Sequence, residues 1–200
     1  MKNTAAVLLF LWSVVALAQE QFDAKKSEAF QKELNAEYAS AKTSPLEAAD
    51  LATFKTLDFY PVTSDFYVHA KFIRTKKEKA FKMKTSTSRA PLYVKYGEVH
   101  FTIKGKECVL NLYRDIVLTR KAAYKNDLFL PFSDLTSGNE TYIGGRYIDL
   151  KIPAGDSIDI DFNTAYNPYC AYNHAYSCPR VPLENDLQVK IEAGVKKFHD

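Results

Sequence analysis

The sequence comprises 200 residues with a formal net charge of +3, and its 27 Lys and Arg residues are interspersed with 24 Asp and Glu residues. This charge excludes a typical nucleic-acid-binding protein, which needs basic residues clustered on one face. The 13 Tyr and 13 Phe residues, against 7 Gly, exclude a low-complexity or disordered chain, because they supply apolar surface for a folded core.

The N-terminus has the composition of a secretory signal peptide. Lys2 precedes an uncharged, mostly apolar run over residues 5–15, and Ala16-Leu17-Ala18 has the small-x-small pattern of a cleavage site. We expect residues 1–18 to be a signal peptide cleaved after Ala18, and the remaining chain to be exported, into the periplasm or out of the cell. No second long apolar run follows, so no membrane span is expected after cleavage.

Two helices are expected in an N-terminal helical segment, residues 19–55. The apolar residues of the first helix recur at multiples of four positions: Phe22, Phe30, Leu34 and Tyr38. This narrow stripe predicts a helix over residues 22–41 that lies on the rest of the domain. Residues 44–47, Ser-Pro-Leu-Glu, have the pattern of a capping box with Pro at the first helical position, and predict a second helix that ends near Lys55.

From residue 56 to residue 200 the pattern changes to the alternation of a mainly β domain. Single strands are predicted at residues 65–73, 128–132 and 187–194. Residues 98–113 predict a hairpin that turns at Gly105-Lys106 and pairs 103 with 108, 101 with 110 and 99 with 112. Residues 146–162 predict a second hairpin, in which 148, 150 and 152 face 158, 160 and 162 across a Pro-Ala-Gly turn.

Helices followed by many antiparallel strands indicate a mainly β fold of the α+β type. We expect an antiparallel sandwich or a barrel-like sheet, with the two N-terminal helices packed on it.

Three cysteines occur in the sequence. Cys108 lies on the apolar face of the first predicted hairpin and is expected in the core. Cys170 and Cys178 lie in a polar, tyrosine-rich segment, and in an exported protein they are disulfide candidates. Two alternatives stay open: zinc binding together with His174, or a free Cys170 that acts as a nucleophile with His174 as its base. Paired CxxC motifs are missing, so we predict neither a metal site nor a cofactor.

A second group of candidates consists of charged residues near the predicted second hairpin. Asp159, Asp161 and Asn163 alternate with apolar residues, so all three project from the non-core face of one strand. Arg146 is expected to form a bidentate ion pair with Asp161 or Glu184. Such a pair would either take part in catalysis or organise a buried polar corner.

Two blocks of the sequence carry a resemblance to a known family. They read SDLTSGNETYIGGRYIDL and IDFNTAYNPYCAYNHAYSCPRVPLENDLQVKIEAGVKKF. Over residues 134–198 they resemble the signature of a bacterial family known as domain of unknown function 1684. Val181 stands where the family pattern has proline, Val195 stands where it has glutamate, and His174 lies outside the pattern.

The resemblance implies family membership and no particular chemistry, since no activity is established for the family. It also implies that the polar positions of the signature gather into a pocket. The candidates for binding a ligand there are Tyr142, Arg146, Asp149, Asp161, Asn163, Tyr166, Asn167, Glu184 and Asn185.

Three functional hypotheses follow. The first is a binding module for a small polar ligand such as a sugar, which would stack on tyrosines and hydrogen-bond to asparagines. The second is a hydrolase that uses Asp161 or Glu184 as acid or base and Arg146 as an oxyanion or phosphate clamp. The third is an exported domain in which the same groups only hold loops in place. The sequence defines neither the ligand nor the oligomeric state.

Overall fold

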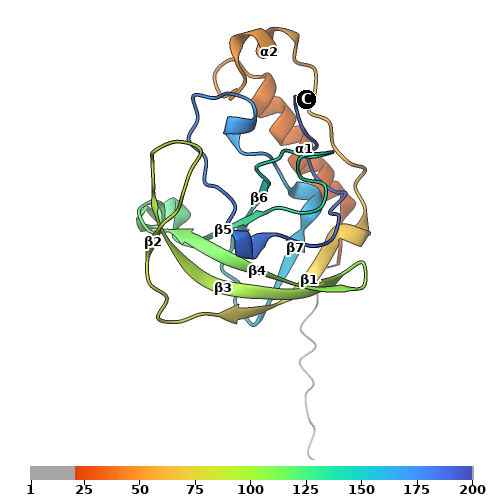
Figure 1. Ribbon diagram of the computed structural model, residues 1–200. Helices are drawn as coiled ribbons and strands as arrows, with labels where there is room; N and C mark the ends of the chain where they lie inside the picture. The colour runs from red at the N-terminus through yellow and green to blue at the C-terminus, as the bar shows by residue number, and fades with distance from the viewer. Residues whose placement is uncertain (1–20, 200) are drawn as a thin grey trace, which may run out of the picture.

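The computed structural model describes residues 21–199, which form one antiparallel sheet with two α-helices on the N-terminal side of the sequence (Figure 1). The predicted signal peptide lies outside the described residues. Within residues 21–199, no helix is both long enough and apolar enough to cross a membrane.

The sheet has seven strands and curls into a half-barrel (Figure 1). Its strands are β1 (Tyr67–Arg74), β2 (Phe81–Lys82), β3 (Leu92–Ile103), β4 (Lys106–Asp115), β5 (Asp127–Phe132), β6 (Arg146–Lys151) and β7 (Ser157–Asp161). Six of them follow the order β6-β5-β4-β3-β1-β7, and β2 pairs with β3. The predicted mainly β fold with a barrel-like antiparallel sheet is therefore confirmed.

Short 3-10 helices connect the strands and shape the loops. They are η1 (Ser64–Phe66), η2 (Leu118–Arg120), η3 (Ala122–Tyr124), η4 (Phe162–Thr164), η5 (Tyr169–Ala171) and η6 (Leu183–Asn185).

Helix α1 (Ala24–Ala39) follows the predicted apolar stripe and packs on the domain. Asp23 caps it by accepting a hydrogen bond from the N–H of Lys25 at 3.0 Å. Its buried residues join a small second core beside the sheet. This core comprises Leu34, Tyr38, Leu46, Leu57, Tyr172 and Val195.

Helix α2 (Ala48–Thr53) is shorter than predicted, and the capping box is wrong. The Ser44 hydroxyl accepts from the N–H of Leu46, two residues on, at 3.2 Å. The N-cap is Glu47, and it makes no side-chain capping bond. Leu46 is buried in the second core, so the chain first turns inward and becomes helical only after that residue.

The predicted hairpin of β3 and β4 forms, but its register differs from the prediction. The turn lies at Lys104 and Gly105, whose φ angles of 48° and 75° suit a two-residue turn. The observed pairs are Ile103 with Lys106, Phe101 with Cys108 and Val99 with Leu110. The predicted partners are therefore wrong by two positions. A shift of two keeps every side chain on its predicted face, so Cys108 is buried in the core as expected.

The predicted second hairpin is wrong. Strand β6 pairs with β5, whereas β7 pairs with β1, so the two strands lie at opposite ends of the sheet order. Alternation in a sequence reports which face of a strand is apolar, but it does not report which strand is its neighbour. Only residues 152–156 connect β6 to β7. A connection of that length reaches about 20 Å, so the curl brings both edges of the sheet close together.

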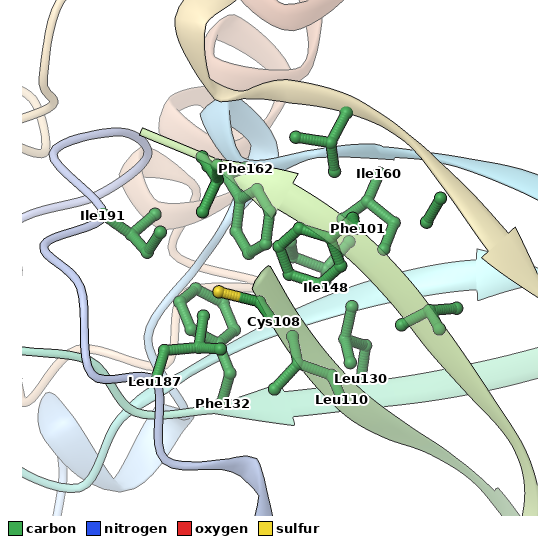
Figure 2. Close-up of a cluster of buried hydrophobic side chains, with 14 of the residues drawn as sticks. Phe101, Cys108, Leu110, Leu130, Phe132, Ile148, Ile160, Phe162, Leu187 and Ile191 are labelled. Atoms are coloured by element: carbon green, nitrogen blue, oxygen red, sulfur yellow. The ribbon is translucent and has the colours of Figure 1, made fainter. Parts of the chain in front are cut away.

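Residues 187–194 form no strand, which corrects the last predicted element. The alternation is nevertheless real, because Leu187, Val189, Ile191 and Ala193 are all buried in the main core. Figure 2 shows Leu187 and Ile191 pointing from this segment toward side chains of the sheet. The segment therefore closes the main core as an irregular extended chain.

Candidate functional site

Arg146, at the start of β6, is completely buried. Its guanidinium group donates to the carbonyl of Ile191 at 2.8 Å and to the carbonyl of Ala193. It forms an ion pair with the buried carboxylate of Asp134 at 3.2 Å. The predicted partners Asp161 and Glu184 are therefore wrong. Burial lowers the pKa of Arg146, and the nearby Asp134 opposes that change.

This ion pair also explains why the C-terminal segment needs no partner strand. Asp134 accepts hydrogen bonds from the N–H of Ile191 at 2.7 Å and from the hydroxyl of Thr136 at 2.9 Å. Together with Arg146, it satisfies backbone groups that a strand would pair with a neighbour. Asp134 could not be identified from the sequence as the partner of Arg146, because a separation of twelve residues does not indicate contact without the fold.

The half-buried Asp161 and the buried Asn163 form a second polar arrangement at the end of β7. Asp161 accepts from the hydroxyl of Ser27 on α1 at 2.5 Å and from the N–H of Asn163 at 2.9 Å. The Asn163 side chain accepts from the N–H of Thr63 at 3.1 Å and donates to its carbonyl at 2.9 Å. These bonds tie α1 and the segment before β1 to the sheet, so they act in folding.

Asn185 fills a gap between two strands. Strands β4 and β5 pair at a single position, Tyr113 with Phe129. Asn185 accepts from the N–H of Asn111 at 2.8 Å and donates to the carbonyls of Asn111 and Pro131 at 2.9 and 2.6 Å. Its amide therefore replaces backbone pairing where the strands separate.

The neighbouring Glu184 is exposed and accepts from the Tyr113 hydroxyl at 3.2 Å. Asn167 is buried and donates to the carbonyl of Lys196 at 2.9 Å and to the hydroxyl of Tyr172 at 3.3 Å. Asn167 thus anchors the C-terminal segment. Glu184 is exposed whereas Arg146 is buried, so the two do not form one site.

A concave site with a volume of about 520 Å³ lies on the outer face of β4, β5 and β6. We call it the aromatic pocket. It is lined by Tyr93, Tyr113, Arg114, Asp115, Leu118, Thr119, Tyr124, Asp127, Leu128, Phe129, Tyr147, Asp149, Lys151, Tyr166, Pro168, Tyr169, Ser177, Cys178 and Pro179. Strand alternation places Phe129 and Tyr147 in this pocket. Their neighbours Leu130 and Ile148 enter the main core, so Phe129 and Tyr147 point to the opposite face of the sheet.

Aromatic rings in mutual contact form one wall of the pocket. Phe129 meets Tyr147 edge-to-face at a centroid distance of 4.7 Å, and Tyr147 meets Tyr166 in the same way at 5.9 Å. Tyr93 adds a further contact with Phe129 at 5.8 Å. Tyr147 is fixed because its hydroxyl donates to the carbonyl of Pro179. A wall of this kind is held in place before any ligand arrives.

Asp149 and Tyr166 supply the main polar pair of the pocket. The Tyr166 hydroxyl donates to Asp149 Oδ2 at 2.7 Å. Asp149 stays exposed to solvent within the pocket, yet the surrounding protein raises the pKa of its carboxyl group, and the hydrogen bond from Tyr166 opposes this. At the rim, Lys151 and Asp127 form an ion pair at 2.6 Å.

Cys170 and Cys178 are free thiols in the structure, as is Cys108, so the expected disulfide is not formed. The two residues are nevertheless adjacent, because the N–H of Cys170 donates to Cys178 Sγ at 3.1 Å. Tyr142, the remaining candidate, places its hydroxyl 3.9 Å from Cys170 Sγ. No group of three or more His, Cys, Asp and Glu side chains among the described residues could hold a metal ion, so His174 does not complete a zinc site with the cysteines.

Comparison with known proteins places the chain in a family. Residues 52–196 match the model of a family described as proteins of unknown function, DUF1684. The chain belongs to this family. A solution NMR structure of an uncharacterized protein from Haloarcula marismortui is similar to this DUF1684 chain, with 29% identity and a TM-score of 0.68 over 86% of this chain and 92% of that one. No curated protein matches the chain.

The polar candidates therefore fall into two groups. Arg146, Asp161, Asn163, Asn167 and Asn185 hydrogen-bond within the fold, whereas other candidates face concave sites. The candidates that face these sites are Tyr142, Asp149 and Tyr166. The outward-facing Phe129 of β5 was not among the predicted site residues. Its alternation with the core residues Leu128 and Leu130 could have predicted its position.

Proposed function

We propose that this DUF1684 protein is exported and binds a small polar ligand, such as a sugar, in the aromatic pocket. The observation that carries the proposal is the Asp149–Tyr166 pair, which lies beside a wall of fixed aromatic rings. A pocket of about 520 Å³ lies in the usual range for small-molecule sites, which is about 300–1,000 Å³.

The chemistry of the lining favours a polyhydroxylated ligand. Aromatic faces pack against the apolar C–H face of a sugar, and a carboxylate accepts hydrogen bonds from its hydroxyl groups. Asp149 engages Tyr166 through Oδ2, which leaves acceptor capacity for a ligand because a carboxylate has about four lone-pair sites. The rim residues Lys151 and Asp127 are charged, so both donors and acceptors surround the opening.

The hydrolase hypothesis, which placed Arg146 with Asp161 or Glu184, has less support. A hydrolase that used Arg146 with Asp161 or Glu184 would need these side chains around one substrate. Arg146 is instead buried on Asp134, and Asp161 hydrogen-bonds to Ser27. The buried polar residues support the purely structural hypothesis, because their hydrogen bonds hold segments of the fold together. That hypothesis does not explain the aromatic pocket.

Export rests on the signal-peptide pattern of residues 1–18. Expression of the full chain in a bacterial host, followed by N-terminal sequencing of the periplasmic fraction, tests this part of the proposal. We expect a new N-terminus at Gln19. A chain that stayed in the cytoplasm with residue 1 intact would contradict export and would leave ligand binding to be judged separately.

Ligand binding is tested by saturation-transfer-difference NMR with a panel of mono- and disaccharides. We expect at least one saccharide to bind, and Asp149→Asn to weaken it about tenfold, which corresponds to about 1.4 kcal/mol. Asp65→Asn is the matched control, because Asp65 is an exposed carboxylate outside the pocket. If no saccharide bound, or if Asp149→Asn and Asp65→Asn bound the saccharide equally well, the proposal of sugar binding in this pocket would be wrong.

A further inference from the structure

Cys170 and Cys178 stand next to each other in the loop that follows η4, although they are eight positions apart in the sequence. The N–H of Cys170 donates to Cys178 Sγ at 3.1 Å. The N–H of Cys178 in turn donates to the hydroxyl of Ser86 at 3.1 Å. The chain is therefore folded so that the two cysteines are in contact, and the Ser86 hydroxyl lies beside Cys178.

The two thiols differ in their access to solvent. Cys170 is half-buried and lines two concave sites of about 500 and 380 Å³. Cys178 is buried, with only 8% of its surface exposed. Cys170 lines both sites, whereas Cys178 lines only the smaller one. A reagent in the larger site would therefore meet Cys170 and not Cys178. Tyr142 lines both sites and places its hydroxyl 3.9 Å from Cys170 Sγ.

The same contacts make the thiols chemically unequal. The hydrogen bond from the Cys178 side chain lowers the pKa of Cys170, and the Tyr142 and Ser86 hydroxyls act in the same direction. The pKa of Cys178 is raised by its bond to Cys170 and by burial. Burial also raises the pKa of Cys108. A thiolate is the reactive form of cysteine, so Cys170 is expected to be the nucleophile among the three.

We propose that Cys170 and Cys178 form a redox-active dithiol that reduces small hydroperoxides, with Cys170 as the attacking thiolate and Cys178 as the resolving thiol. An accessible nucleophilic cysteine beside a second thiol is the arrangement that such chemistry requires. Cys178 also lines the aromatic pocket, but the attacking Cys170 faces two other concave sites and not that pocket. Peroxide reduction can therefore be tested without any sugar.

The reaction proceeds in two steps. The Cys170 thiolate attacks the terminal oxygen of the hydroperoxide, the O–O bond breaks, and the departing alkoxide takes up a proton to become an alcohol. The sulfur of Cys170 is thereby oxidised by two electrons to a sulfenic acid. The Cys178 thiol then attacks that sulfur, a disulfide forms, and water leaves. Two equivalents of an external thiol, or one external dithiol, supply two electrons and two protons to restore the protein dithiol and are themselves oxidised to a disulfide.

Hydroperoxides fit this site better than a large disulfide substrate does. The sulfur of Cys170 is half-buried in a concave site of about 380 Å³, which suits a small molecule. The Tyr142 hydroxyl, which lies 3.9 Å from Cys170 Sγ, can also donate to the departing oxygen, which eases cleavage of the O–O bond.

The first test uses the unmodified chain. The reduced protein is treated with one equivalent of hydrogen peroxide, and the product is measured by intact mass and peptide mapping. We expect a product two hydrogens lighter, with a Cys170–Cys178 disulfide, a free Cys108, and full reversal by dithiothreitol. No loss of hydrogens, or oxidation at Cys108 as fast as at Cys170, would overturn the proposal.

Variants then separate the two roles. With Cys178→Ser, peroxide is expected to leave a sulfenic acid on Cys170 that dimedone traps, whereas Cys170→Ser should abolish both the adduct and the disulfide. Cys108→Ser is the matched control and should behave as the unmodified chain.

A variant-free measurement guards against misfolding of Cys178→Ser, whose side chain is buried. In the unmodified protein at neutral pH, iodoacetamide should label Cys170 at least about tenfold faster than Cys108. The reason is that the pKa of Cys170 is lowered to about 6 whereas burial raises the pKa of Cys108, so a much larger fraction of Cys170 is thiolate. Equal labelling rates for Cys170 and Cys108 would contradict the role of Cys170 as the attacking thiolate and would overturn the proposal. Reaction with oxidised glutathione but not with peroxide would overturn the hydroperoxide substrate.

Discussion

The network around Arg146 and the aromatic pocket both include residues of β6 but satisfy their polar groups in different ways. Arg146 and Asp134 are fully buried and bond to each other and to backbone groups. Asp149 is exposed in its pocket and hydrogen-bonds to Tyr166 through Oδ2. The network stabilises the fold, whereas the pocket keeps acceptor capacity that a ligand can use.

Strand geometry explains this division. Arg146 and Asp149 lie three positions apart on β6, so they project from opposite faces of the sheet. Arg146 enters the side closed by the C-terminal segment, and Asp149 enters the aromatic pocket. Polar residues that are close in a sequence motif can therefore serve unrelated purposes, and the parity of their positions decides which.

The largest expected effect tests the network. Arg146→Ala should lower the free energy of unfolding by about 3–5 kcal/mol, because it leaves Asp134 buried without its countercharge. Denaturant titration measures the loss. The control Arg120→Ala removes an exposed arginine and should change stability by about 0.5 kcal/mol or less. A loss that small for Arg146→Ala would show that the network does not stabilise the fold.

Asn185→Ala tests the join between β4 and β5. It leaves the Asn111 N–H and the carbonyls of Asn111 and Pro131 without the Asn185 amide. We expect a loss of about 2 kcal/mol, since buried unpaired polar groups cost about 1–3 kcal/mol. Thermal unfolding followed by circular dichroism measures it. Asn139→Ala, at an exposed position, should have almost no effect. Equal melting temperatures for the two variants would contradict the bridging role.

Tyr166→Phe sharpens the contrast on the pocket side. It removes one hydroxyl and should cost no more than about 1 kcal/mol in stability. The pKa of Asp149 should rise further, because the Tyr166 hydrogen bond lowers it. NMR titration of the Asp149 carboxyl carbon measures the change. An unchanged or lower pKa would mean that the hydroxyl does not bond to Asp149 in solution.

The smallest expected effect concerns pH. The folded protein raises the pKa of Asp149, so the folded state holds this proton more tightly than the unfolded chain does. Stability therefore falls as the pH rises from the pKa of this carboxyl group in the unfolded chain to its higher pKa in the folded protein. Asp149→Asn should remove this slope and raise stability at pH 7 by about 0.5 kcal/mol or less, because the group is exposed and screened. Unfolding titrations between about pH 3 and pH 8 check the slope, and a steeper fall in the variant would contradict the sign.

The sequence predicted the local elements better than their partners. The position of α1, the hairpin of β3 and β4 with its apolar faces, and the core position of Cys108 followed from periodicity. The supposed hairpin of β6 and β7 failed, because an alternating pattern and a turn-like Pro-Ala-Gly segment are equally compatible with a connection between two sheet edges. The strand predicted at residues 187–194 failed for a related reason, since its alternation reflects burial against the core rather than pairing.

The candidate site shows the same limit. The sequence by itself determined the apolar faces, the mainly β class and the block of residues in which the polar side chains concentrate, because these depend on the order of residues along one chain. Only the tertiary structure decided that Arg146 meets Asp134, that Asn185 joins two strands, that Tyr166 donates to Asp149 and that Cys170 touches Cys178. Each of these contacts joins segments whose distance in space is set by the curl of the sheet and the folding of its loops, and no spacing in the sequence encodes it.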